Sequence, residues 1–159
     1  MLYPLHKTIA PSSDIEAALN DLQQIIVHRM QLHFNQQTFG FDKWILDTFN
    51  DGLMKQDITR HLPAAINTDE WIVLMLSLVP HIHPNFFESI IAEHLPNGGD
   101  FAEFGGVKGS NHRSLLPTGE TVQFILAGKD IEQRLQVHQL FSEDHFFYRL
   151  FIKISFKKF

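Results

Sequence analysis

The amino-acid sequence predicts a mainly α-helical fold, a helical bundle with a long N-terminal helix and a small β wing. Apolar residues recur at helical spacing in several segments, and glycine and proline separate those segments. One stretch near the C-terminus instead alternates apolar with polar residues. Spacings of three and four residues indicate a helix with one buried face, whereas strict alternation is typical of a half-buried strand.

The first helix is expected over residues 14–34. Ser13 followed by Glu16 predicts a capping box at its N-terminus. Its opposite face is polar, which favours packing on a core; a partner-binding arm or a dimer contact is the alternative. Five apolar residues define its buried face: Ile15, Leu19, Leu22, Ile26 and Met30.

The middle of the chain predicts a short helix after Phe39, then a loop, and then a central helix. The triplet Asn50-Asp51-Gly52 interrupts the helical spacing, so the chain beyond it is expected to be a loop up to Pro63. Thr68 is the expected N-cap of the next helix. The run from Trp71 to Val79 is almost wholly apolar, so this helix should lie in the core.

Proline and glycine mark the ends of the next two helices. Pro84 suits the first position of one helix, and Pro96-Asn97-Gly98-Gly99 should end it. Pro117-Thr118 can start the other, with Gly128 as its C-terminal cap. A strand over residues 122–126 is the alternative for that segment.

The C-terminal third predicts one more helix and a strand. Residues 130–140 again have helical spacing, and residues 151–157 alternate isoleucine and phenylalanine with lysine and serine. This strand needs a partner, because an isolated strand leaves its hydrogen-bonding groups unpaired. Residues 101–104 are the candidate partner, which would form the small β wing.

Length and composition indicate a globular chain. With 159 residues, 44% of them apolar and 19% charged, it fits one domain or one domain with a helical arm. It has no cysteine, which excludes a disulfide framework and thiolate chemistry. No signal peptide is evident, and the longest apolar run is too short to span a bilayer, so we expect a cytoplasmic protein without membrane contact.

Charge is unevenly distributed. Residues 1–144 carry nine Lys and Arg against 18 Asp and Glu, whereas residues 145–159 carry four basic residues and no acidic one. Nucleic-acid binding draws its free energy mainly from neutralising phosphates with Lys and Arg. The acidic body therefore predicts weak or no nucleic-acid binding, confined to the basic tail.

The most unusual feature is a glycine-rich segment, residues 101–121. Glycine admits backbone conformations with φ above zero, and consecutive N–H groups in such a turn can face an anion. Anion or nucleotide-phosphate contact is therefore the functional hypothesis, and a tight turn packed against the domain is the alternative. The spacing is not that of a phosphate-binding P-loop. The candidate anion-binding residues are Gly105, Gly106, Lys108, Gly109 and Arg113.

Ten histidines raise the question of a metal site. His81 and His83 are the pair whose side chains could face one way from an extended loop, so they are the weak metal candidates. Zinc sites need three or four ligands, and neither His94 nor His112 lies in a recognised spacing. The alternative is that the pair hydrogen-bonds around a turn. Ser110, beside His112, lacks an orienting motif, so no catalytic residue is predicted.

Three stretches of the sequence resemble the region ahead of the ATPase module in a family of bacterial AAA-type ATPases. The resemblance covers residues 70 to 147, and Arg149 to Phe159 departs from it. It implies an N-terminal helical arm or subdomain over residues 1–66 and a winged-helix-like domain over residues 67–159. The matching stretches are Phe101-Ala-Glu-Phe-Gly-Gly-Val-Lys-Gly109, Leu116-Pro-Thr-Gly-Glu-Thr-Val-Gln-Phe-Ile-Leu-Ala-Gly128, and Leu140 to Phe147.

The resemblance implies a non-catalytic interaction or regulatory domain. No ATP-binding lysine motif or acidic magnesium-binding pair occurs in this sequence, so ATP and Mg²⁺ would bind an ATPase module that this chain does not contain. Its expected partners are that module in cis, other proteins and, as a further possibility, a second copy of the chain. The alternative is a standalone helical DNA-binding or adaptor protein, and a small-molecule enzyme using the glycine-rich segment comes third.

Overall fold

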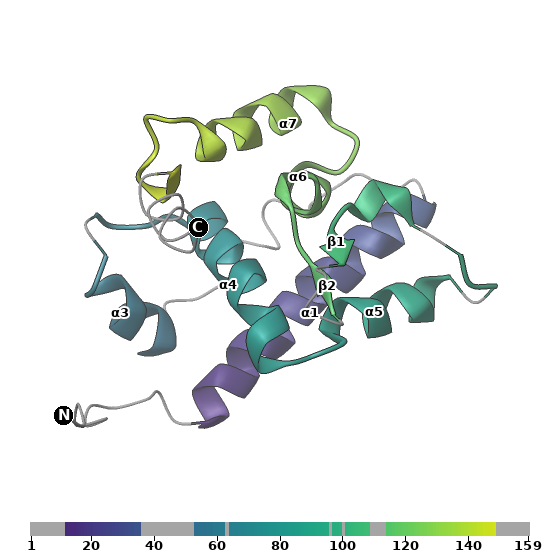
Figure 1. The fold of residues 1–159 in the computed structure, drawn as a ribbon, viewed down its shortest axis with the longest axis horizontal. Coiled ribbons are helices and arrows are strands. Elements are labelled where there is room, and N and C mark those ends of the chain that lie inside the picture. The colour runs from purple at the N-terminus through teal and green to yellow at the C-terminus, as the bar shows by residue number, and fades with distance from the viewer. Residues whose placement is uncertain are drawn as a thin grey trace.

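The computed structural model describes residues 12–35, 53–62, 64–95, 97–99, 101–108 and 114–148. In these ranges six α-helices pack together with one two-stranded antiparallel hairpin (Figure 1). The predicted mainly helical fold class with a small β element is therefore confirmed. The strand predicted over residues 151–157 lies outside the described ranges.

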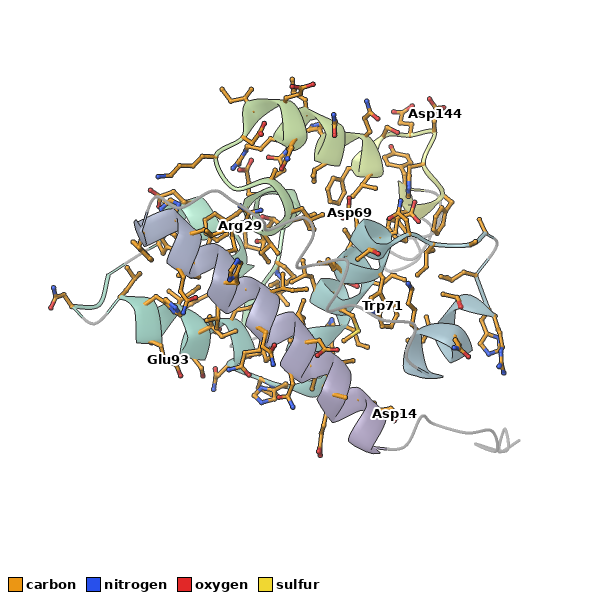
Figure 2. All side chains as sticks on the ribbon, turned by 180° about the vertical axis from the view of Figure 1, so that it is seen from behind. Asp14, Arg29, Asp69, Trp71, Glu93 and Asp144 are labelled. Atoms are coloured by element: carbon orange, nitrogen blue, oxygen red, sulfur yellow. The ribbon has the colours of Figure 1, made fainter. Side chains whose placement is uncertain are left out.

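Helix α1, Ser12–Asn35, is the long N-terminal helix that the apolar spacing predicted. It crosses one side of the molecule, in front of the other helices when the protein is seen from behind (Figure 2). Leu22, Ile26 and Met30 on its buried face are fully inaccessible to solvent. The capping box predicted at Ser13 involves a side chain outside the described part.

Helix α3, Leu53–Thr59, lies where a loop was expected. That prediction was wrong, because a helix begins at Leu53, directly after Asn50-Asp51-Gly52. The sequence Leu-Met-Lys-Gln after the glycine consists of good helix formers. Ile58 of α3 packs against the core, and α3 contacts α1.

Helix α4, Thr68–Ile82, is the central helix of the core. Its N-cap is Asn67, one residue before the predicted Thr68. Asn67 Oδ1 accepts the Glu70 N–H at 2.9 Å, and Glu70 Oε2 accepts the Asn67 N–H at 2.8 Å. This reciprocal pair is a capping box, and an asparagine at the N-cap satisfies it better than the threonine after it.

Helices α5, Phe86–His94, and α6, Gly119–Ala127, lie beside α1. The expected first residue of α5, Pro84, falls two residues too early, since Asn85 takes the cap position with φ of 63°. For α6 both ends are confirmed, with Thr118 as N-cap and Gly128 as C-cap. The alternative strand over residues 122–126 is wrong.

Helix α7, Ile131–His138, follows α6 and lies on the outside of the bundle (Figure 1). Asp130 caps it by accepting the Gln133 N–H at 3.1 Å. A 3-10 turn, η2, Gln139–Phe141, continues it. Val137 is the one residue of α7 that is buried among those described.

The hairpin lies inside the glycine-rich segment. Strand β1, Val107–Lys108, pairs antiparallel with β2, Leu115–Leu116, and Lys108 lies opposite Leu115. The predicted strand at residues 101–104 is wrong, because Ala102–Phe104 form a 3-10 turn, η1. The N–H groups of Phe104 and Gly105 bond back three residues, which buries the Phe104 ring completely instead of extending the chain.

Candidate functional site

Two glycines of the glycine-rich segment have no room for a side chain, because Gly105 packs on α6 and Gly106 packs on β2. Gly105 and Gly106 have φ of 70° and 92°. A Cβ on Gly105 would lie 2.6 Å from the Cβ of Glu120, and one on Gly106 would lie 2.6 Å from a methyl carbon of Leu115. The sequence therefore correctly indicated a segment whose glycines adopt positive φ. The described part of this segment is packed against the rest of the domain.

The backbone donors of these two glycines are already used within the protein. The Gly105 N–H donates to the Ala102 carbonyl at 3.0 Å, and the Gly106 N–H donates to Thr118 Oγ1 at 3.2 Å. They therefore cannot face an anion in this arrangement. Lys108 is exposed on β1, while Gly109 and Arg113 lie outside the described ranges. The anion-binding hypothesis for the whole segment stays a prediction.

A pocket of about 560 Å³ lies between α5 and the hairpin. Its walls are mostly apolar, and two charged residues, Glu88 of α5 and Lys108 of β1, are part of the lining. Glu88 Oε1 accepts the Leu115 N–H, and this bond joins α5 to β2. Glu88 Oε2 is buried without a hydrogen-bond partner among the described residues. The apolar lining is Ile91, Ala92, Leu95, Phe101, Ala102, Val107 and Leu115.

The histidine pair proposed for a metal does not lie in an extended loop. Helix α4 continues through Ile82, so His81 is helical and His83 is its C-cap. Successive positions on a helix turn by about a hundred degrees, so residues two apart face different ways. His94 Nδ1 lies 2.9 Å from the Ile90 carbonyl. Within the described ranges no group of three or more His, Asp or Glu side chains could hold a metal ion.

The sequence reasoning missed a buried arginine that joins α1 to the end of α6. Arg29 is 9% exposed, and Figure 2 shows it on α1. Its Nε donates to the Ile125 carbonyl at 2.8 Å, and a terminal nitrogen donates to the Leu126 carbonyl at 3.0 Å. A cation at a helix C-terminus is favourable because the last carbonyls carry partial negative charge. The sequence feature that could have indicated this contact is the single arginine of α1, which lies next to the apolar stripe of the helix.

A second polar contact missed in sequence joins α4 to the C-terminal part. His145 Nδ1 accepts the Phe147 N–H at 3.2 Å, so the proton is on Nε2, which donates to Glu70 Oε1 at 2.8 Å. Both ring nitrogens are then engaged, and Glu70 also accepts at the N-cap of α4. In this tautomer His145 has no free lone pair to act as a base, so the pair is structural.

The exposed face of α7 carries apolar side chains. Ile131 is 75% exposed and Leu135, one turn later, is 67% exposed. Phe141 of η2 is 37% exposed and lies near Gly119 of α6. The helix predicted from the apolar spacing over residues 130–140 is confirmed. We call Ile131, Leu135 and Phe141 the α7 ridge.

Helix α6 is unsuited to entering a DNA groove. Every one of its residues from Thr121 to Ala127 is buried except Gln123, which is partly buried. Its exposed residues are Gly119 and the acidic Glu120. A recognition helix must present side chains to base edges, so α6 cannot act as one in this fold.

His33 of α1 lies in an aromatic cluster. Its ring makes edge contacts with Phe101 and Phe124 at centroid distances of 5.2 and 5.5 Å. Burial lowers the pKa of His33, and Lys129 lowers it further, while Glu103 opposes this shift. The neutral imidazole is therefore favoured, which suits a ring packed among aromatic side chains.

Comparisons with known proteins identified no similar protein. No protein-family model matches the sequence, and the searches for similar curated proteins and solved structures produced no match. Among the described helices, none has both the length and the hydropathy needed to cross a membrane.

Proposed function

We propose that this chain is a non-catalytic interaction and regulatory domain, winged-helix-like, that works with an AAA-type ATPase module. The sequence resemblance in residues 70–147 motivates the family. In the structure the three resembling stretches fall on η1 with β1, on β2 with α6, and on η2. They therefore contribute the hairpin and helix α6, and a hairpin beside a helix is what supports the winged-helix-like part of the proposal.

The observation that carries the interaction role is the α7 ridge. Burying a leucine or isoleucine side chain stabilises a protein by about 1.5–3 kcal/mol, and Ile131 and Leu135 give up most of that gain in the isolated chain. Their neighbours on α7 are polar, so the ridge is a defined apolar strip on a polar helix. Such a strip fits a contact with an apolar surface of another protein.

We assign this contact to the ATPase module in cis. Stable independent complexes bury about 800 Å² on each partner, far more than a few side chains offer. A covalently joined module needs less area, because the linker gives it a high effective concentration. The ridge therefore fits an intramolecular contact that forms and breaks during regulation.

The test compares ATP turnover in the protein encoded by the complete reading frame that contains this chain. The double variant Ile131→Ser and Leu135→Ser should change turnover severalfold, and Glu132→Gln on the same helix should not. Denaturant melts of the 159-residue chain check that both variants fold. A reading frame without an ATPase motif would refute the family assignment, and unchanged turnover in a true ATPase would refute the regulatory contact.

A further inference from the structure

We propose that the pocket between α5 and the hairpin binds a small apolar monocarboxylate, of the kind that a medium-chain fatty acid provides. The apolar walls receive the hydrocarbon chain, and Lys108 at the rim pairs with the carboxylate. No residue of α7 lines this pocket, so the site is separate from the α7 ridge and does not depend on the proposed ATPase partner.

The pocket has the size and the walls of a small-molecule site. Its volume of about 560 Å³ lies within the roughly 300–1,000 Å³ typical of such sites. Helix α5, the η1 turn and the hairpin each contribute to its walls. Small-molecule sites combine predominantly apolar walls with a few polar groups that fix the orientation of the ligand, and this lining has that composition.

The apolar walls are held in place before a ligand arrives. Ile91, Phe101 and Leu115 pack against the core and are only partly buried. Val107 of β1 is 55% exposed. All four side chains also line the pocket. A hydrocarbon chain that covers them removes apolar surface from water, and walls that are already ordered lose little conformational freedom when they are covered.

Lys108 is the charged group that a ligand in this pocket can reach. The lining contains one other charged residue, Glu88. Glu88 Oε1 accepts the Leu115 N–H, which offsets part of the carboxylate charge, and Oε2 is buried away from solvent. The Lys108 side chain is exposed and forms no ion pair with a described residue. The pocket therefore selects a negatively charged head group, which stays at the rim beside Lys108.

Other occupants fit the pocket less well. A phosphate needs several donors, and the Gly105 and Gly106 N–H groups are engaged within the protein. A cationic ligand is repelled by Lys108. An added peptide strand needs a longer sheet edge than β1 and β2 offer, since each has two residues. A single carboxylate on an apolar chain matches both the one accessible charge and the walls.

The experiment titrates the 159-residue chain with octanoate and with butanoate, followed by two-dimensional NMR. Octanoate has the longer hydrocarbon chain, and each half-buried methylene group raises affinity about twofold, so octanoate should bind about tenfold more tightly. The shifted amide signals should come from the pocket lining, with those of Leu95, Phe101 and Val107 among them. Equal affinity for the two acids, no saturable binding of octanoate, or shifts confined to other regions would overturn the proposal.

A charge-reversal variant tests the role of Lys108. Lys108→Glu replaces the attraction of an exposed ion pair with repulsion, so it should weaken octanoate binding about fivefold. Binding of octan-1-ol, which is uncharged, should not change. Lys129→Glu makes the same change in net charge at a position outside the pocket lining, so it is the matched control and should keep the octanoate affinity of the parent. Equal weakening by the two variants would show that Lys108 does not recognise the carboxylate, and the proposal would fail.

A steric variant locates the site independently of charge. Ala92 is an exposed residue of α5 that lines the pocket, so the larger side chain of Ala92→Phe should occupy the pocket and abolish binding of both octanoate and octan-1-ol. Denaturant midpoints of the three variants and the parent should agree, because all three positions are exposed. Unchanged octanoate binding by a folded Ala92→Phe variant would place the ligand elsewhere and refute the proposal.

Discussion

Replacing Gly105 by alanine tests whether the glycine-rich segment is a packed structural element. Gly105 has φ of 70° and ψ of −157°, a region that essentially only glycine adopts. Holding an L-residue there costs about 1–3 kcal/mol. The added Cβ would also lie 2.6 Å from Glu120 Cβ and 3.1 Å from the Thr121 nitrogen, both fixed by α6. Forcing such a contact costs about another 1–3 kcal/mol.

The expected loss of unfolding free energy for Gly105→Ala is therefore about 2–6 kcal/mol. Gly98→Ala is the matched control, because Gly98 has φ of 69° but no atom within 4 Å of its added Cβ. It should lose about 1–2 kcal/mol, the cost of the left-handed backbone alone. Urea unfolding followed by circular dichroism measures both, with equal m-values as the check. Equal stability of the two variants would refute the close packing of η1 on α6.

Three further outcomes follow from the described contacts. Arg29→Met should lower the unfolding free energy by about 2–4 kcal/mol, since it removes the two charged hydrogen bonds to the Ile125 and Leu126 carbonyls. Arg134, whose side chain is 30% exposed and donates to the Gly128 carbonyl, is the control, and Arg134→Met should cost about 1 kcal/mol. Urea melts compare the two variants, and equal losses would contradict a special role of the buried Arg29. Burial lowers the pKa of His33 below its ordinary 6.5, so its contribution to stability is complete above that pH and falls as the pH drops through it. His33→Gln should therefore reduce the stability loss between about pH 7 and about pH 5 without abolishing it, because the pKa of His28 is lowered as well, and an unchanged slope would show that His33 is not the titrating group. Calorimetry of the 159-residue chain with Mg-ATP should show no saturable heat, and binding that Lys108→Ala abolishes would contradict the non-catalytic assignment.

Local sequence signals predicted most of the helices. The apolar stripe predicted α1, and the apolar run from Trp71 to Val79 predicted α4. Thr118 and Gly128 predicted the two ends of α6. These signals are short-range, because they depend on spacing along one helix and on caps next to it. Where a cap was misplaced, as at Thr68, the adjacent Asn67 competed for the same role.

The errors and omissions depended on tertiary contacts. Residues 101–104 could have extended as a strand, but burial of Phe104 in the core favours a 3-10 turn. The two hydrogen bonds of Arg29 join positions 96 and 97 residues apart in the sequence, and the Glu70–His145 contact joins positions 75 residues apart. No spacing rule within one helix relates such residues. The pocket beside Glu88 likewise forms from three separate segments, so sequence patterns could indicate Lys108 as a candidate but not the residues around it.

The central claim, a non-catalytic domain that regulates an ATPase module, is tested most directly by ATP turnover. The comparison uses the 159-residue chain, the protein from the complete reading frame, and that protein with Ile131→Ser and Leu135→Ser. We predict no turnover by the chain alone, turnover by the complete protein, and a severalfold change in the double variant. Turnover by the chain alone, or none by the complete protein, would contradict the claim.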